Sequence, residues 1–392
     1  MVTSFVGIAI VPPSSSASFA SNPFKYSEVL SDRAELVGRD EAIADIESHL
    51  FCESPRSVNL HGAMRLGKSS LLKYFETQAV NIAQANHLGT WVVTGVSLKD
   101  AECRTVGGFH RRLLRDLAEQ SVVRANPTIA DGVSKAIAAI DQDSTQDGRS
   151  LEQVLALLRD AGWRWLICLD DFEDAMDHPE AFGMDFYDGW RNRAQNYRVL
   201  LLVASRRDVE IYSREKKITS DFFSILQKVS LSPLNRAAAE TLLSCPWAGA
   251  GLNDEEKAAA LKWVKQPEGY EPELLQKAGH YLWRARHEGK TIDWARQKFL
   301  EQTRPVKLPS EPQPGQGKEI FAAIVGPFKT VGQFVQWLAA KKDGIQSTLW
   351  GVVTVILLSC IAVGWLKPPQ VQGVIKSVMD LLDRPSEPSN EK

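Results

Sequence analysis

Two hydrophobic patterns alternate along the first part of the chain. Short continuous apolar runs lie near 58–60, 90–96, 164–169 and 198–205, and segments with apolar residues at helical spacing lie near 107–121, 150–161 and 183–195. Continuous runs are typical of strands buried on both faces, and their alternation with helices is typical of repeated β-α-β units. The pattern predicts an open α/β fold, a parallel sheet with helices on both faces, with a ligand at the carboxyl ends of the strands.

The strand pattern stops at about residue 234, and helical segments take its place. Three helices are expected: from Asn235 to Leu243, from Asn253 or Asp254 to Val264, and from Pro272 to Arg286. Asn and Asp are suited to cap a helix, and Pro is suited to its first turn. We therefore predict a core domain over 22–233 and an all-α lid domain over 234–303.

A membrane signal follows the lid. Residues 304–318 are rich in Pro and Gly, which is typical of a linker. Residues 349–366 are apolar or uncharged without interruption, long enough to span a bilayer core of about 30 Å. Trp350 and Trp365 lie near the two ends of this stretch, as in an aromatic belt. A single transmembrane helix over 345–367 is predicted; the alternative is a buried helix.

The segments around this span carry weaker patterns. Residues 319–344 place apolar side chains on one helical face, which favours an amphipathic juxtamembrane helix on the membrane surface or one packed on the core. Residues 368–392 are expected to be a short C-terminal tail. Residues 1–21 are expected to be a flexible N-terminal tail; a targeting segment is the alternative, although no basic residue precedes its apolar run.

The charge balance and the cysteine pattern bear on which ligands and sites are expected. Among 392 residues, 46 are Lys or Arg and 48 are Asp or Glu, so the formal net charge is −2 and nothing global indicates nucleic-acid binding. The five cysteines are scattered and include no C-x-x-C pair, so neither a zinc site nor a disulfide framework is indicated. The body of the protein is expected to lie in the cytoplasm.

Residues 62–69 match the phosphate-loop pattern G-x-x-x-x-G-K-[ST] in full. They read Gly62, Ala63, Met64, Arg65, Leu66, Gly67, Lys68 and Ser69, and Ser70 follows. A predicted strand precedes them and a helical pattern follows, which is the context that the pattern requires. We predict that this loop cradles the phosphates of ATP, with Lys68 on the β and γ phosphates and the Ser69 hydroxyl on Mg²⁺. The alternative is a chance glycine turn before a helix.

A carboxylate pair ends a second predicted strand. The apolar run that closes at Leu169 is followed by Asp170 and Asp171. Carboxylates at the end of a central strand suit metal coordination and the polarisation of a water molecule. We assign Asp170 to Mg²⁺ and Asp171 to the position of a catalytic base; the alternative is an ordinary acidic turn.

Several motifs in order resemble one known family. They are Asn22 to Tyr26, Leu36 to Glu41, the phosphate loop, Leu169 to Glu173, Leu200 to Arg206, Leu231 to Leu234 and Gly269 to Gln276. Together they are similar to the prokaryotic STAND ATPases, the signal-transduction branch of the AAA+ superfamily. The resemblance spans about residues 22–300.

The resemblance implies further site residues. Val37, Gly38 and Arg39 are similar to the segment that covers adenine and ribose, and Pro272 belongs to a lid-side motif. Arg206 resembles the residue that senses the γ-phosphate, a role that suits the donor fork of a guanidinium group. The alternatives are a solvated charge pair for Arg206 and a plain charge at a helix start for Arg39.

One residue departs from the pattern of hydrolysing relatives. Asp171 stands where they usually carry Glu, one methylene longer, so a water held there is less well placed. Since a displacement of 1 Å costs on the order of 100-fold in rate, slow hydrolysis is expected. Glu173 is near in sequence, but two residues further on it is expected to point away from the cleft.

The combined interpretation is a membrane-anchored STAND-type ATPase that uses ATP and Mg²⁺. It is expected in the inner (cytoplasmic) membrane, single-pass, with its body in the cytoplasm. The resemblance implies self-association into a homo-oligomer, so that nucleotide state controls a membrane-level response in signalling or in defence against phage or stress, with an unknown protein as trigger or effector. Two alternatives stay open: a non-hydrolysing ATP-dependent scaffold that recruits a partner, and an AAA+ regulator of DNA transactions such as transposition.

Overall fold

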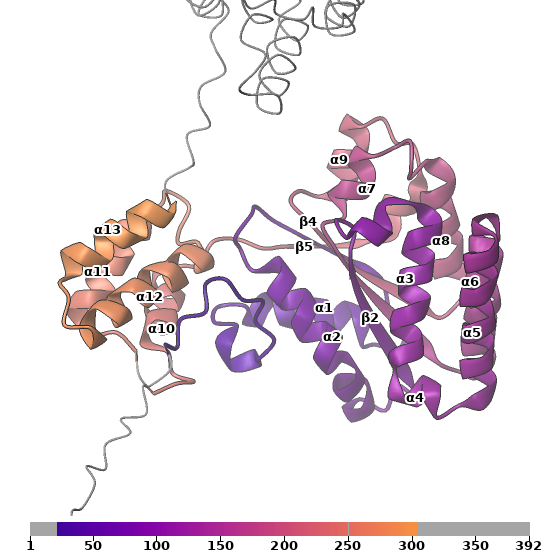
Figure 1. The fold of residues 1–392 in the computed structure, drawn as a ribbon, viewed down its shortest axis with the longest axis horizontal. Helices are drawn as coiled ribbons and strands as arrows, with labels where there is room; N and C mark the ends of the chain where they lie inside the picture. Colours follow the sequence, from indigo (N-terminus) through magenta and orange to yellow (C-terminus); the bar gives the residue numbers. More distant parts are fainter. Residues whose placement is uncertain (1–21, 250, 304–392) are drawn as a thin grey trace, which may run out of the picture. The chain divides into compact units, whose positions relative to one another are not determined.

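The computed structural model describes residues 22–249 and 251–303, and its centre is a five-stranded parallel sheet (Figure 1). The strands are β1 Val58–His61, β2 Trp91–Ser97, β3 Arg164–Asp170, β4 Val199–Ser205 and β5 Gln227–Ser230, in the order β2-β3-β4-β1-β5. The predicted parallel α/β sheet is therefore confirmed. Because β1, β3 and β4 are neighbours and run in one direction, the chain segments that leave their carboxyl ends meet at one edge of the sheet.

Helices cover both faces of the sheet. They are α1 Asp40–Leu50, α2 Lys68–Ala85, α3 Val106–Glu119, α4 Ser121–Arg124, α5 Pro127–Gln142, α6 Asp147–Asp160, α7 Glu173–Asp177, α8 Met184–Asn196 and α9 Val209–Glu215. Short 3-10 turns lie at Arg33–Glu35, Ala101–Arg104, Ser144–Gln146 and Asp221–Ile225. The helical patterns near 107–121, 150–161 and 183–195 correspond to α3, α6 and α8.

Alternate side chains of the central strands enter two separate hydrophobic cores. On β3, Leu166 and Cys168 face the core that α1 and α2 cover, whereas Trp165, Ile167 and Leu169 face the core that α3, α6 and α8 cover. Both faces are buried, and this is why the sequence of β3 is apolar without interruption. The edge strand β5 has only one buried residue of four, so its sequence carries no such run and does not predict it.

Four helices after β5 form the lid, which has a hydrophobic core of its own. They are α10 Arg236–Ser244, α11 Asp254–Val264, α12 Pro272–His287 and α13 Ile292–Thr303, packed against one another in Figure 1. The predicted caps are present. Asn235 accepts a hydrogen bond from the backbone N–H of Ala238, and Asn253 forms a capping box with Glu256. Each cap satisfies backbone donors that the helix itself leaves unpaired.

The remaining sequence predictions fall on other parts of the chain. The N-terminal tail, the linker over 304–318, the amphipathic segment over 319–344, the transmembrane span over 345–367 and the C-terminal tail over 368–392 lie outside the described residues. Across 22–249 and 251–303, no helix has the length and apolar character needed to cross a membrane.

Candidate functional site

The predicted phosphate loop connects the central strand β1 to helix α2. Gly67 takes a left-handed conformation with φ of +90° immediately before Lys68 begins α2, a conformation that favours glycine. Gly62 is constrained differently: a Cβ atom there would lie 2.5 Å from the carbonyl oxygen of Leu231. The two required glycines of the motif therefore have separate structural reasons, one conformational and one steric.

Lys68 lies among the charged side chains at the carboxyl edge of the sheet. Its Nζ donates to the carbonyl oxygens of Gly62 and Ala63, both at 2.8 Å. Burial lowers the pKa of Lys68, and the negative charges of Glu173, Asp170 and Asp171 oppose that shift while Arg206 adds to it. The structure therefore brings residues that are far apart in the sequence into one electrostatic cluster, which we call the Lys68 cluster.

The acidic pair after β3 has its own partners. Asp170 ends the strand, and its Oδ1 accepts a hydrogen bond of 2.9 Å from the backbone N–H of Asp171. Asp171 has a φ of +52°, which Asp tolerates better than most residues. Its carboxylate forms an ion pair with Lys99 and accepts a hydrogen bond of 3.2 Å from the Ser97 hydroxyl. The predicted base is therefore engaged by side chains at the end of β2.

Glu173 differs from its sequence expectation. The residue is 8% exposed, and its carboxylate faces Lys68 instead of pointing away from the cleft. Glu173 Oε1 lies 2.8 Å from Arg206 Nε, and Oε2 accepts a hydrogen bond of 3.3 Å from the Arg206 backbone N–H. The first turn of α7 turns the chain back after Asp171, which is why a residue two positions further on returns to the site.

A buried asparagine fixes the segment that carries Arg206. Asn59 in the middle of β1 is fully buried and donates to the Ser205 hydroxyl at 2.8 Å and to the Val203 carbonyl oxygen at 3.2 Å. Its side-chain oxygen accepts from the backbone N–H of Val209 at 3.2 Å. Buried polar groups need such partners, and here they tie both ends of the segment after β4 to the strand that leads into the phosphate loop.

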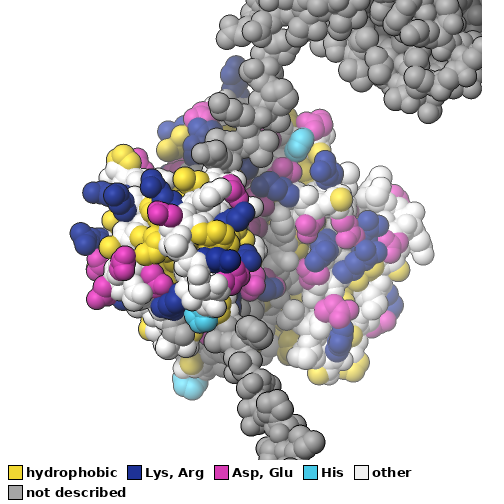
Figure 2. Space-filling model, turned by 60° about the vertical axis from the view of Figure 1, so that its left-hand side comes forward, with side chains coloured by type: hydrophobic (Ala, Val, Ile, Leu, Met, Phe, Trp, Pro, Cys, Tyr) yellow, Lys and Arg dark blue, Asp and Glu magenta, His cyan; other side chains and the backbone are white. Residues whose placement is uncertain are grey.

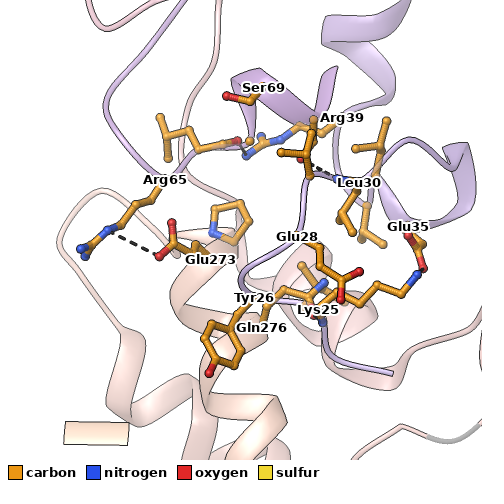
Figure 3. A pocket seen from close by; sticks show the side chains of 18 of the residues that line it. Lys25, Tyr26, Glu28, Leu30, Glu35, Arg39, Arg65, Ser69, Glu273 and Gln276 are labelled. Atoms are coloured by element: carbon orange, nitrogen blue, oxygen red, sulfur yellow. Dashed lines mark hydrogen bonds and ion pairs between the residues drawn. The ribbon is translucent and has the colours of Figure 1, made fainter. Parts of the chain in front are cut away.

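A cavity of about 410 Å³ lies beside the second half of the phosphate loop (Figure 3). Its walls come from three parts of the chain: residues 25–30 with 35–37 and 39, residues 65–70, and Leu242, Pro272, Glu273 and Gln276 of the lid. Val37, Arg39, Ser69, Ser70 and Pro272 thus line it as site residues that the sequence predicted. Asp170, Asp171 and Arg206 belong to the Lys68 cluster and do not line this cavity.

We call residues 22–30 the strap, and its residues 25–30 form one wall of the cavity. Phe24 is 2% exposed within the lid core, and Lys25 donates its backbone N–H to the Gln276 side-chain oxygen at 3.1 Å. At the other end, the backbone N–H of Leu30 donates to the Ser70 hydroxyl at 3.1 Å. The strap therefore joins the lid helix α12 to the start of α2.

Arg39 and its neighbours occupy the corner between the phosphate loop and the lid. The Arg39 guanidinium donates to the carbonyl oxygens of Leu66 and Ser232, both at 2.9 Å, and burial lowers its pKa to about 10. Gly38 has a φ of +70°, and a Cβ atom there would lie 2.7 Å from the Cβ of Ala238. Of the three predicted residues, Val37 and Arg39 line the cavity, but the Arg39 donors point to backbone carbonyl groups.

The phosphate loop also contacts the lid directly. Arg65 Nε lies 3.7 Å from Glu273 Oε1, at the start of α12 (Figure 3). Both side chains are partly exposed, so this ion pair contributes little to stability. Met64, in the same loop, is exposed.

Sequence reasoning missed several residues at the site. Ser97 ends β2 and Lys99 lies just beyond it, as Asp170 ends β3 and Asp171 lies just beyond it. In a parallel sheet the ends of adjacent strands lie together. That topology is the only signal that points to them. The strap wall and Glu273 carried no signal beyond the motif resemblance.

Comparisons with solved structures give low similarity over most of the chain. The structure is similar to the Walker-type ATPase of Pyrococcus abyssi, with 14% identity, 92% of each chain covered and a TM-score of 0.49. The ORC2 protein of Aeropyrum pernix is 15% identical, with 93% of this chain and 98% of that chain covered and a TM-score of 0.49. A Drosophila ORC bound to DNA is 13% identical, with 97% of this chain and 88% of that chain covered and a TM-score of 0.49. These values do not define a ligand or partner for this chain.

The comparison by sequence is more specific. No curated protein matches the chain. A family model described as an AAA ATPase domain matches residues 35–187, a stretch that contains the phosphate loop and both aspartates of the Lys68 cluster and stops before Arg206 and the lid. The matched part of the chain thus runs from the end of the 3-10 turn at Arg33–Glu35, through α1 and β1, to the first turn of α8.

Proposed function

We propose that the protein binds Mg-ATP between the sheet and the lid and hydrolyses it slowly. One observation carries this proposal: Lys68, at the start of α2, lies within electrostatic reach of Asp170, Asp171, Glu173 and Arg206. A cation on a glycine loop next to strand-end carboxylates is the arrangement that phosphoryl transfer from a nucleoside triphosphate requires. The match of residues 35–187 to an AAA ATPase domain supports the same activity.

The phosphates would bind at the loop itself. Backbone N–H groups of residues 62–69 and the N-terminus of α2 provide donors and a positive dipole. Lys68 has only carbonyl partners within the loop, and a phosphate oxygen is a stronger acceptor for an ammonium group. We therefore expect Lys68 Nζ to exchange Gly62 and Ala63 for the β and γ phosphates.

Ser69 and Asp170 are the residues that would hold Mg²⁺. Within 22–249 and 251–303, no three His, Cys, Asp or Glu side chains are grouped so as to bind a metal by themselves. A hydroxyl and one carboxylate fit Mg²⁺, which is commonly held by one or two protein ligands together with phosphate oxygens and water. When bound, the ion would neutralise charge that develops on the phosphate oxygens.

Slow turnover follows from the partners of Asp171. Both carboxylate oxygens are directed to Lys99 and Ser97, so a water molecule has to compete with them for the base. This arrangement also suits the alternative of an ATP-dependent scaffold that retains nucleotide with little turnover. The number of turnovers per bound nucleotide distinguishes the two.

The cavity beside the loop would take the base and ribose. Its volume of about 410 Å³ lies within the range of about 300–1,000 Å³ that is usual for small-molecule sites. The strap and the lid both contribute to its lining, so a nucleotide bound there would contact both.

Removal of the metal tests the proposal. We expect excess EDTA to abolish steady-state ATP turnover in the full-length protein, because Ser69 and Asp170 then have no ion through which to contact the phosphates. Excess Mg²⁺ should restore turnover, while added Ca²⁺ should not, because Ca²⁺ favours longer bonds and a larger coordination number. Phosphate release is the measurement, and turnover that persists unchanged in EDTA contradicts the proposed metal site.

Replacement of Glu173 tests the role of its ion pair with Arg206. Glu173→Gln keeps the shape but removes the charge that holds Arg206, and hydrogen bonds to charged groups contribute about 1.5–3 kcal/mol. We expect kcat to fall by roughly tenfold or more, since 1.4 kcal/mol corresponds to a factor of ten, with little change in KM. Glu215→Gln is the matched control, because Glu215 pairs with Arg207 outside the cluster. Equal turnover in wild type and Glu173→Gln would show that Arg206 needs no positioning.

The membrane and partner predictions extend this proposal. We keep the inference from residues 349–366 that the chain is anchored in the cytoplasmic membrane with its ATPase body in the cytoplasm, and that nucleotide drives self-association. Deletion of 345–392 should release the protein from the membrane fraction while ATP turnover is retained. If the shortened chain stays with the membrane, the anchor lies elsewhere.

DNA binding is the remaining alternative. The sequence argument against nucleic acid rests on a net charge of −2, and on the face shown in Figure 2 positive and negative side chains are interspersed. The Drosophila ORC structure was determined with DNA bound. Because its identity to this chain is 13%, the bound DNA is a property of that protein alone. Salt-dependent retention of the full-length protein on duplex DNA would favour the alternative, since phosphate contacts weaken steeply with salt.

A further inference from the structure

The buried arginine of the motif at residues 37–39 donates its hydrogen bonds to backbone carbonyl groups. Arg39 is 7% exposed, and among the described residues no carboxylate pairs with it. Burial alone accounts for the lowering of its pKa to about 10, so the group stays charged at neutral pH. Burying an unpaired charge is costly unless its hydrogen bonds are good. The two that Arg39 donates are both 2.9 Å long and end on backbone carbonyl groups.

One of these carbonyl groups belongs to the phosphate loop. Leu66 directly precedes Gly67, whose left-handed conformation sets the direction of Lys68. The Leu66 side chain is itself 2% exposed in the core beneath α1 and α2. The Leu66 carbonyl oxygen therefore lies between the buried Leu66 side chain and the Gly67 turn that orients Lys68.

The other carbonyl group belongs to the connection between the sheet and the lid. We call residues 231–234, between β5 and α10, the hinge. Leu231 donates its backbone N–H to the His61 carbonyl oxygen at 2.7 Å, and Leu234 exchanges two backbone hydrogen bonds with Tyr270, at 2.8 and 2.9 Å. Ser232 lies between these two attachments, one to the sheet and one to the lid.

From this placement we infer that Arg39 is a positioning residue that joins the phosphate loop to the lid hinge, so that the two segments move together. A planar guanidinium can donate in two directions from one rigid group, and a lysine cannot span both carbonyl groups in that way. The resemblance placed Arg39 over the adenine and ribose; the geometry assigns its donors to the chain itself. In the cycle, which rests on the proposed function, phosphates that reshape the loop would shift Ser232 and with it the lid.

Amide hydrogen exchange on the full-length, nucleotide-free protein tests whether Arg39 joins the phosphate loop to the hinge, a connection that we call the joint. In Arg39→Lys we expect exchange to accelerate by about tenfold in both 62–68 and 231–234, because one ammonium group cannot hold both carbonyl groups and the connection between the two segments is broken. The central strand β3 should be unchanged. Arg39→Met, which offers no donor, should show the larger effect, and Arg33→Met is the control, because Arg33 pairs with Asp40 at the surface.

The outcomes separate the joint from simpler roles. Faster exchange in the loop with an unchanged hinge, or the reverse, overturns the inference, since Arg39 would then brace one segment only. Acceleration throughout the sheet also overturns it, because it would mark a general packing role. If Arg39→Met does not fold, Arg39→Lys still decides the result.

A second measurement adds nucleotide. With a non-hydrolysable ATP analogue, wild type should change exchange in both 62–68 and the lid helix α10, whereas Arg39→Lys should respond in the loop and not in α10. A response in α10 that survives the substitution overturns the inference. If wild type does not respond in the loop at all, the proposed ATP site fails, and the nucleotide-free measurement alone decides whether the joint exists.

Discussion

Loss of ATP turnover in Lys68→Ala is the largest effect that we expect. The variant removes the ammonium group at the centre of the Lys68 cluster and leaves Glu173, Asp170 and Asp171 without their nearest cation in the loop. Their mutual repulsion with triphosphate then opposes binding as well as chemistry. Removing one preorganised donor from a transition state costs roughly 10²–10³ in kcat, and we expect a fall in kcat/KM of at least that size.

Phosphate release over a range of ATP concentrations, together with titration of a fluorescent ATP analogue, measures this effect. Lys73→Ala is the matched control, because Lys73 is on the same helix but pairs with Glu76 on its exposed side. Its kinetic constants should stay within a factor of two or so of wild type, as is usual for isolated surface ion pairs. Retained turnover in Lys68→Ala would place the phosphates away from residues 62–69 and end the proposal.

The second large effect is expected for Phe24→Ala, which detaches the strap from the lid. Phe24 is 2% exposed, and the ring lies so close to α12 that a Cβ atom on Gly279 would be 2.4 Å from its Cδ1. Truncation of a buried Phe costs about 3–5 kcal/mol. Because the strap is a wall of the cavity, nucleotide affinity should fall together with the free energy of unfolding.

Urea unfolding and nucleotide titration measure the two consequences. Ile211→Ala, on an exposed position of α9, is the control for stability and should change the free energy of unfolding by less than about 0.5 kcal/mol. Gly279→Ala should reproduce the loss of affinity from the opposite side of the contact, since the added methyl group displaces the ring. An unfolding midpoint of Phe24→Ala equal to that of wild type would mean that the strap does not stabilise the lid.

The sequence predicted those parts of the fold that leave a local pattern. Strand β3 is apolar because two cores bury its two faces, and Asn235 and Asn253 mark helix starts because a cap acts within three residues. Strand β5 has one buried side chain, so nothing in its four residues distinguishes it from a loop. The hydrophobic pattern of a sequence reflects the burial of its side chains, and few side chains of this edge strand are buried.

The partners of charged residues could not be predicted, because they come from distant parts of the chain. Nothing near Asp171 in the sequence indicates that Lys99 and Ser97 hold its carboxylate. Glu173 was expected to point away because it lies two residues beyond Asp171, whereas a helical turn begins there and returns it to the site. Arg39 matched a motif for ligand contact, yet its donors meet two backbone carbonyl groups from segments 27 and 193 residues away.

The place of β1 between β4 and β5 sets the order in which a nascent chain can complete the site. Asn59 on β1 and Val203 on β4 are 144 residues apart, and β5 follows later still. At about 5–20 residues per second, a ribosome needs roughly 7–30 s to supply the first neighbour of β1. During that time the strand that leads into the phosphate loop has no partner on either side. The complete nucleotide site, which needs β1 held in the sheet and Arg206 after β4, therefore forms only once β4 has been synthesised.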